Sequence, residues 1–532
     1  MAGERKNGKR RVNAQESLPA NLVREGRLFY APEDLASDRY IQDLSFPGRE
    51  PFTRGTDTGM YRTEQWQIRQ CISHSSPEDA NSSIRYLLAN GINSFGLVFD
   101  TLTDAGAYPS GIKGRKTQEG GLSVSSLSDM KALLKSISPS GISPCFHVNS
   151  AAPQIVSMYM AACASRRAGF ETLAGMVQND PIEDFMTGLI TPPDFAVSME
   201  LSSALIHYCL DSMPFFRPLC VSGYKLREYG GSEVQEIAFV ISSALAHLEE
   251  AEKNGIEPER LLSRLSFILG VGTDVPAEIA KFRAARRLWF RIIKTRYPGV
   301  SDSLARFEFT ARSSDSALAG GEPEINTVRS TMQALAAVLG GARAIHVGYS
   351  GGPDSLSGDA KLRHELMLHR IIIGESGVAD TIDPAAGSYY VETLTDEMEA
   401  KGRSLIRHIS GMGGMLNAIS SGYVRKEIER NAAETREQMD SGRKYVVGVN
   451  ILRRGRTSTR TPARGRAVYP SAHRTVSSGS NAPVRKSVAP FLNSIPAFEA
   501  GDAGLIPAMV RAFIHGATLG EVTSAVLRRR SD

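Results

Sequence analysis

The chain of 532 residues is too long for one small hydrophobic core and suits one large domain with appendages. Its 42% hydrophobic and 22% charged residues are ordinary for a globular protein, and the sequence has no apolar run of about 18 residues that would form a transmembrane helix. Five cysteines without CxxC or zinc-type spacing, and a basic N-terminus without an apolar segment behind it, favour a reduced cytoplasmic setting over secretion.

The net charge of +5 is concentrated in one segment, residues 451–490, which contains nine Lys and Arg residues and no acidic residue. The segment is rich in Ser, Thr, Pro and Gly, which is typical of a solvated linker. A basic segment can also bind nucleic acid, but no nucleic-acid-binding fold surrounds these arginines. We therefore expect a linker, with neither nucleic acid nor a membrane as a partner.

Short apolar segments, most of them ended by Gly, Asp, Asn or Ser, alternate with amphipathic helical patterns. In the helix predicted after Asp274, for example, Pro276 suits the first turn, and Ile279, Phe282 and Trp289 share one face. Eight strands alternating with helices indicate an α/β fold, a (β/α)8 TIM barrel, rather than an open sheet with a G-x-G-x-x-G loop. The predicted strands are 94–100, 143–148, 174–180, 217–223, 265–272, 306–313, 342–349 and 377–384.

The barrel accounts for part of the chain only. The predicted division is residues 1–90 as an N-terminal extension for CoA or subunit contacts, 91–445 as the substrate-binding TIM barrel, 446–495 as a basic flexible linker, and 496–532 as C-terminal docking helices. The last part reads as two short amphipathic helices, which we expect to dock on their own barrel or on a partner.

In a TIM barrel the active site lies at the carboxyl ends of the strands. Many polar residues there are expected to cap the helix that follows, as is predicted for Asp100 and Asp180. Lys225 does not fit that explanation, because lysine is a poor N-cap. The polar residues predicted at these ends are Asp100, Asn149, Gln178, Asn179, Asp180, Tyr224, Lys225, Arg312, Ser313, Ser314, His346 and Asp383.

Several ordered motifs resemble the large catalytic subunit of coenzyme-B12-dependent acyl-CoA mutases, the methylmalonyl-CoA and isobutyryl-CoA mutase family. They are "RGTDTGMY" (54–61), "WQIRQ" (66–70), "VQNDPIEDFM" (177–186), "VSGYKLREYGG" (221–231), "FRAARRLW" (282–289), "DPAAGSYYVE" (383–392) and "DSGRKYVVGVN" (440–450). The resemblance covers roughly residues 40–450 and, more weakly, the last thirty.

The resemblance implies a barrel around the tail of coenzyme A, with the acyl group at the top under adenosylcobalamin. The D-x-H-x-x-G cobalamin motif is absent, so the cofactor is expected on a separate small cobalamin-binding subunit, in a hetero-oligomer such as two large and two small subunits. The implied reaction is a radical 1,2-rearrangement of the carbon skeleton of an acyl-CoA, in which the protein excludes water and polarises the carbonyl.

By the resemblance, Tyr224, Lys225 and Gln178 are the catalytic residues. Lys225 stands where the family has a thioester-facing histidine; an ammonium can donate a hydrogen bond to the carbonyl, with Glu228 as the nearest local partner. Gln178 matches the family's active-site glutamine. The same resemblance suggests that Glu228, Thr187 and Glu375 contact the cofactor.

The predicted substrate-binding residues depart from the family in two informative places. Cys71 replaces a larger Tyr, Phe or Ile, which predicts a roomier pocket. Gly188 takes the place of the arginine that pairs the free carboxylate of methylmalonyl-CoA, and losing that bidentate partner argues against a malonyl-type substrate. Lys225 or Arg312 remain alternatives for meeting a carboxylate.

The remaining substrate-binding candidates are Arg69 and His346, which match the family, and Arg312, Asp57 and Gly96, which do not. Arg312 replaces a glutamine, Asp57 a tyrosine and Gly96 a serine that faces CoA. Asp57 is expected to cap a turn rather than meet a ligand. The loss of several CoA-facing residues leaves open a different thioester carrier.

Three functions remain in competition. The first is a mutase for an isobutyryl-like or bulkier acyl-CoA. The second is a divergent family member that has lost mutase activity and serves as a binding or scaffold subunit, which the change at Lys225 favours. The third is a TIM-barrel enzyme that uses Lys225 as a Schiff-base or general-base residue.

Overall fold

The computed structural model of the chain describes residues 40–106, 121–188, 192–319, 322–348, 358–452, 486–495 and 504–531. Most of the basic segment predicted at 451–490 lies outside these residues. In the described residues, no helix is long and apolar enough to cross a membrane.

Within the described ranges, ten short strands, all paired in parallel, form the centre of the molecule. Two pairs of them are each one strand interrupted by a single residue: β1 (Gln67–Ile68) and β2 (Gln70–Ile72) flank Arg69, and β6 (Phe216–Arg217) and β7 (Leu219–Ser222) flank Pro218. The other strands are β3 (Ser94–Val98), β4 (Ser143–His147), β5 (Gly175–Val177), β8 (Leu265–Val271), β9 (Phe309–Ser313) and β10 (Ala344–His346).

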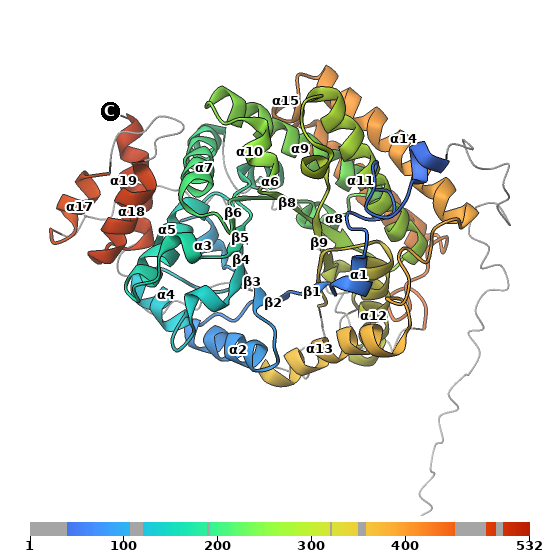
Figure 1. Cartoon of the computed structure of the whole chain (residues 1–532), viewed down its shortest axis with the longest axis horizontal. Coiled ribbons are helices and arrows are strands. Elements are labelled where there is room, and N and C mark those ends of the chain that lie inside the picture. The colour runs from blue at the N-terminus through green and yellow to red at the C-terminus, as the bar shows by residue number, and fades with distance from the viewer. Residues whose placement is uncertain are drawn as a thin grey trace, which may run out of the picture.

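The strands close into a ring. One run of pairing is β1-β10-β9-β8-β7 and the other is β2-β3-β4-β5-β6. The Arg69 N–H donates to the Ile345 carbonyl at 2.9 Å, and the Cys220 N–H donates to the Gln178 carbonyl at 2.9 Å, so the backbone remains paired at both interruptions. Figure 1 shows the strands enclosed by a ring of helices. The predicted (β/α)8 barrel is confirmed.

Two strand assignments from the sequence are wrong. Residues 377–384 form turns ahead of α14 (Tyr389–Gly411) rather than an eighth strand. The first barrel strand is instead β1–β2, which was expected to lie in the N-terminal extension. Because Arg69 lies inside the barrel and Gln70 is also buried, this strand lacks the apolar run that marks the others. The segment 217–222 is therefore the fifth strand in chain order.

Helices cover the outside of the barrel. The long ones are α2 (Pro77–Ala89), α5 (Ala152–Ala164), α7 (Pro192–Ser212), α9 (Glu233–Lys253), α11 (Val275–Arg296), α12 (Pro323–Leu339) and α13 (Gly358–Glu375). The shorter ones are α1 (Met60–Thr63), α3 (Thr101–Asp104), α4 (Leu127–Leu133), α6 (Pro181–Thr187), α8 (Tyr224–Glu228) and α10 (Pro258–Leu262). In α11, the residues predicted on one face, Ile279, Phe282 and Trp289, are buried, as expected.

The helices α14, α15 (Met415–Ser420) and α16 (Tyr423–Asp440) follow the barrel. The long helix α14 packs against α9 and α11. The N–H groups of the Arg283 guanidinium on α11 donate to the carboxylates of Asp383 and Glu392. These ion pairs join the "FRAARRLW" and "DPAAGSYYVE" motifs, which lie about a hundred residues apart in the sequence.

The C-terminal helices α17 (Ala489–Asn493), α18 (Leu505–Ile514) and α19 (Leu519–Ser531) dock on the same chain. Figure 1 shows them beside α5 and α7. Met509 and Phe513 of α18 are fully buried in the core that also contains α5, and burial of such a side chain contributes about 2 kcal/mol. The two amphipathic helices predicted at the C-terminus are present, and the surface they cover is that of their own barrel.

Candidate active site at the carboxyl ends of the barrel strands

The short helix α8 directs charged side chains away from the end of β7 in different directions. It starts after Gly223, where a Cβ atom would lie 2.6 Å from Cγ of Glu236, so the close approach of α9 requires glycine. One turn of helix then carries Lys225, Arg227 and Glu228, and each of these residues has a different set of partners.

Lys225 points into a cluster of carboxylates. Its Nζ atom lies 3.4 Å from Oε2 of Glu183, 3.4 Å from Oδ1 of Asp184 and 3.9 Å from Oδ2 of Asp104. The Nδ2 atom of Asn149 donates to both Glu183 and Asp184, at 2.7 and 3.0 Å. The ends of four neighbouring strands thus contribute to the cluster, whereas the local partner expected from the sequence, Glu228, is not part of it.

The electrostatics of this acidic cluster keep Lys225 charged. Burial works to lower the pKa of Lys225, but the charges of Glu183, Asp184 and Asp104 outweigh it and hold the pKa well above its ordinary value. Burial and the charge of Asp184 raise the pKa of Asp104 to about 7, against the opposing charge of Lys225. A lysine held protonated in this way is a poor nucleophile, which argues against the Schiff-base function.

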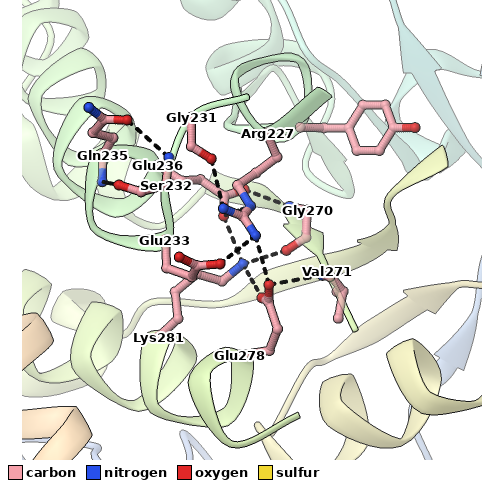
Figure 2. A network of polar contacts seen from close by, with 12 residues as sticks. Arg227, Gly231, Ser232, Glu233, Gln235, Glu236, Gly270, Val271, Glu278 and Lys281 are labelled. Carbon is pink, nitrogen blue, oxygen red and sulfur yellow. Dashed lines mark hydrogen bonds and ion pairs between the residues drawn. The ribbon is translucent and has the colours of Figure 1, made fainter. Parts of the chain in front are cut away.

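Arg227 takes part in a second, more deeply buried network, shown in Figure 2. Its NH2 atom donates to Glu233 at 2.6 Å and to Glu278 at 3.0 Å. Lys281 is fully buried between Glu236 and Glu278, at 2.7 and 2.5 Å. Burial alone would raise the pKa of Glu233, but the charge of Arg227 lowers it to about 2. This network joins α8, α9 and α11 and so fixes the helix that carries Tyr224 and Lys225.

Tyr224 and Arg312 form the aromatic and cationic part of the site. The Arg312 guanidinium lies 3.8 Å from the centre of the Tyr224 ring, in a cation–π contact between β9 and α8. The Tyr224 hydroxyl donates to Oδ2 of Asp315 at 3.1 Å. Arg312, which replaces a family glutamine, is therefore positioned over a retained family residue.

Glu228 lies on the Asp315 side of α8. Its carboxylate accepts a hydrogen bond from the Ser316 N–H at 2.9 Å. Burial and the charge of Asp315 raise the pKa of Glu228 to about 7. Glu228 is thus a half-buried carboxyl group with an easily gained proton, at the rim of the barrel.

Cys71, Gly96 and His147 meet inside the barrel. The Sγ atom of Cys71 lies 3.5 Å from Nε2 of His147. A Cβ atom on Gly96 would lie 2.7 Å from that nitrogen and 2.8 Å from Sγ, so glycine leaves the space that the imidazole fills. His147 was not among the residues predicted for the site; its position two residues after Cys145 on an interior strand face was the available signal.

Gln178 and His346 complete this interior group. Gln178 is buried and hydrogen-bonded to the His147 side chain. His346 lies 2.8 Å from Oε1 of Gln70 through its Nδ1 atom, which also accepts the Cys71 N–H at 3.1 Å. Burial and the charge of Arg312 lower the pKa of both histidines well below the ordinary value, so both rings are neutral at physiological pH.

Arg69 reaches across the barrel below this group. Its Nε atom donates to Ser94 at 2.9 Å, and NH1 donates to Thr310 at 2.8 Å. Its NH2 atom donates to Gln67 at 2.8 Å. Side chains of β1, β3 and β9 are thus connected through one guanidinium, which places a positive charge on the path where the resemblance expects the CoA tail.

Gly188 and Thr187 lie at the end of α6, close to the acidic cluster. Gly188 has φ = +74°, and a Cβ atom there would lie 3.0 Å from NH2 of Arg425 on α16. The Thr187 hydroxyl is buried and donates within its own helix, to the carbonyl of Glu183 at 2.8 Å. This bond leaves Thr187 poorly placed for the cofactor contact that was predicted.

Three predicted residues do not join the site. Asp57 is exposed and accepts the Gly59 N–H at 2.6 Å, which is the turn-capping role expected of it. Asp383 pairs with Arg283 and not with residues of the site. Glu375 is exposed at the end of α13, the helix in which Arg370 contacts Asn90 ahead of β3, and the structure does not bring it to Glu228.

The two helix caps predicted at strand ends have different outcomes. Asp100 accepts the Thr103 N–H at 2.8 Å and caps α3 as expected. The prediction for Asp180 is wrong, because its side chain makes no capping bond to α6. Its Oδ1 atom instead lies 2.8 Å from Nε2 of His247, and both side chains are almost completely buried.

Comparison with known proteins places this site in a family. The model of methylmalonyl-CoA mutase matches residues 24–531 of the chain. The chain belongs to the methylmalonyl-CoA mutase family. The family is cobalamin-dependent, and its acyl-CoA mutases are isomerases of the intramolecular-transferase class, so the resemblance and the enzyme class predicted from the sequence are confirmed.

Individual relatives are about one-third identical to the chain. The 2-hydroxyisobutanoyl-CoA mutase large subunit of Aquincola tertiaricarbonis is 34% identical over 79% of this chain and 75% of its own length. The methylmalonyl-CoA mutase large subunit of Porphyromonas gingivalis is 34% identical over 80% of this chain, and methylmalonyl-CoA mutase of Escherichia coli is 30% identical over 82%. The matches span only 59% and 62% of these two relatives. The name "large subunit" implies a small-subunit partner for the proteins that carry it.

Proposed function

We propose that this chain is the large, substrate-binding subunit of an adenosylcobalamin-dependent acyl-CoA mutase whose acyl group has no free carboxylate, such as an isobutyryl group. The family membership supports the reaction class. The observation that carries the substrate class is Gly188, which contributes no side chain at the position of the carboxylate-binding arginine. The similarity to the 2-hydroxyisobutanoyl-CoA mutase large subunit agrees with a branched, uncharged acyl group.

The residues of the rim fit a cobalamin-borne nucleoside in part. The half-buried carboxyl group of Glu228 suits hydrogen bonds from hydroxyl groups such as those of a ribose. Thr187 and Glu375 do not fit, because one hydroxyl is bonded within α6 and the other side chain is exposed away from the rim. When bound, the cofactor supplies the carbon-centred radical that starts the rearrangement.

The chain's own residues hold and shield the acyl thioester. Tyr224, fixed by Arg312 above its ring and Asp315 at its hydroxyl, forms one wall of the site. Cys71 contributes a small side chain that stays uncharged, because burial raises the pKa of its thiol. Buried side chains around a substrate exclude water from reactive species.

A second substrate class is favoured by one observation. The guanidinium of Arg425 lies near the position where a side chain at residue 188 would start. Helix α16 therefore supplies a positive charge close to the position of the family's carboxylate-binding arginine. An acyl group with a free carboxylate, as in methylmalonyl-CoA, is the corresponding candidate.

One assay separates these functions. The chain is purified with a cognate small cobalamin subunit and adenosylcobalamin, and incubated in turn with isobutyryl-CoA, 2-hydroxyisobutanoyl-CoA and methylmalonyl-CoA; isomerised thioesters are identified by chromatography and mass spectrometry. We expect turnover of an uncharged branched acyl-CoA and none of methylmalonyl-CoA. Turnover of methylmalonyl-CoA that is lost in Arg425→Leu supports the second class instead. No product from any substrate contradicts the mutase function and favours the binding or scaffold subunit.

A further inference from the structure

His147 occupies the place inside the barrel where the family's active-site positions converge. The ring lies against Cys71 on one side and is hydrogen-bonded to Gln178 on the other. By the resemblance described above, both of these positions are expected to lie at the substrate. His147 ends β4, so its side chain projects from the carboxyl end of an interior strand rather than from a loop.

The space for this ring depends on Gly96 of the adjacent strand. Any side chain at Gly96 would overlap with Nε2 of His147, since a Cβ atom there would be only 2.7 Å away. The glycine in place of the family's serine and the histidine on β4 are therefore one structural unit. The departure at Gly96 makes room for an imidazole instead of simply removing a contact to CoA.

Lys225 is poorly placed to donate a hydrogen bond to the thioester carbonyl, which is the role that its sequence position suggested. Its ammonium group is held by Glu183 and Asp184, and its side chain is only 29% exposed. To meet a thioester carbonyl it would have to abandon these partners and leave their charges buried, which is unfavourable. His147 has no such competing ion pair among its described contacts, and its neutral ring carries one N–H, which is available to a carbonyl in the tautomer whose other nitrogen accepts a hydrogen bond from the Gln178 amide.

We propose that His147 is the hydrogen-bond donor to the thioester carbonyl of the acyl-CoA, in place of the histidine that the family carries at the position of Lys225. Gln178 orients the ring, and Gly96 gives it room. The donor has moved from the end of the fifth strand to the end of the third, and it approaches the same carbonyl from another side of the barrel. This inference rests on the proposed function, since it assumes that an acyl-CoA binds here.

The test compares two ligands that differ at the carbonyl only. Binding of isobutyryl-CoA and of its thioether S-isobutyl-CoA, in which CH2 replaces the carbonyl, is measured by calorimetry with the full chain. We expect the wild type to prefer the thioester about tenfold, the value of one good hydrogen bond. His147→Leu should reduce the preference to about onefold, and His147→Gln, which retains an N–H donor, should restore part of it.

Two variants guard against a general structural effect. Gly96→Ala pushes the imidazole aside without replacing it and should also lower the thioester preference. His408→Gln changes an exposed histidine on α14, outside the site, and should leave the preference at the wild-type value. Thermal unfolding of each variant shows whether the fold is retained.

The outcomes distinguish this inference from the proposed function. A wild type that binds neither ligand overturns both. Binding with a thioester preference that His147→Leu leaves unchanged overturns the role of His147 alone. A preference that is lost in Lys225→Gln and retained in His147→Leu assigns the donor to Lys225 and equally overturns the inference.

Discussion

The ammonium group of Lys225 lies 3.4 Å from the carboxylate of Glu183, a residue contributed by the end of a neighbouring barrel strand. By the resemblance, the family has histidine at the position of Lys225, so the substitution introduces a full positive charge at this site. Glu183 pairs that charge, and this explains how lysine can replace the histidine without an unpaired charge at the site.

Removing the Lys225 charge should destabilise the protein moderately. Lys225→Met leaves Glu183, Asp184 and Asp104 without their counter-ion, and we expect the free energy of unfolding to fall by about 1–2 kcal/mol, because partial exposure screens the cluster. Urea unfolding at pH 8 measures this value. Lys253→Met, at a largely exposed pair on α9, is the control and should change stability by less than about 0.5 kcal/mol. Equal effects of the two substitutions would contradict the structural role of Lys225.

Lys281 should be the more costly lysine to replace. It is fully buried between Glu236 and Glu278, in the network of Figure 2. Lys281→Met leaves two buried carboxylates with Arg227 as their shared cation, and we expect a loss of about 3–5 kcal/mol in the free energy of unfolding. A loss no greater than that of Lys225→Met, measured under the same conditions, would show that water reaches this network.

Glu228 should make stability depend on pH. Its pKa is raised in the folded protein to about 7, so the stability it contributes is present below its ordinary pKa and is lost as pH rises through 7. Glu228→Gln removes this titration and keeps an acceptor for Ser316. We expect the free energy of unfolding of the variant, relative to that of the wild type, to rise by on the order of 2 kcal/mol between pH 4 and pH 8. Glu429→Gln, at an exposed position, is the control. A difference in stability between Glu228→Gln and the wild type that stays constant across this pH range would contradict the raised pKa of Glu228.

The docking of α18 offers two adjacent residues for comparison. Phe513 is fully buried against the barrel core, whereas Ile514 is 48% exposed. Phe513→Ala should lower the free energy of unfolding by about 3–5 kcal/mol through lost burial and the cavity it leaves. Ile514→Ala should change it by less than about 0.5 kcal/mol, as is usual for surface substitutions. Similar small effects for both would mean that α18 contributes little to the stability of the barrel.

The fold was largely predictable because buried parallel strands leave a strong local pattern. The exceptions were segments in which that pattern misleads. The strand interrupted at Arg69 carries polar side chains into the barrel. The segment 377–384 is moderately apolar, but it forms turns in which Asp383 accepts a hydrogen bond from Arg283. Neither exception can be recognised without knowing which residues lie opposite.

The site was predictable in position but not in detail. Parallel strands place Gln178, Tyr224 and Arg312 at one end of the barrel whatever their side chains do. The direction of Lys225 depends on carboxylates from other strand ends, and the place of His147 depends on a glycine about fifty residues away. These contacts join residues that are far apart in the sequence, so no local sequence pattern predicts them.

The central claim, carbon-skeleton rearrangement of an uncharged branched acyl-CoA, is tested most directly by following the migrating bond. Isobutyryl-CoA labelled with 13C at the carbonyl and at the adjacent carbon is incubated with the chain, its small cobalamin subunit and adenosylcobalamin, and the product is examined by 13C NMR. Transfer of the thioester carbonyl to a methyl carbon breaks the labelled carbon–carbon bond, so the account predicts a straight-chain product without the one-bond coupling. Unchanged isobutyryl-CoA that keeps its coupling, under conditions in which the chain binds the ligand, would contradict the account.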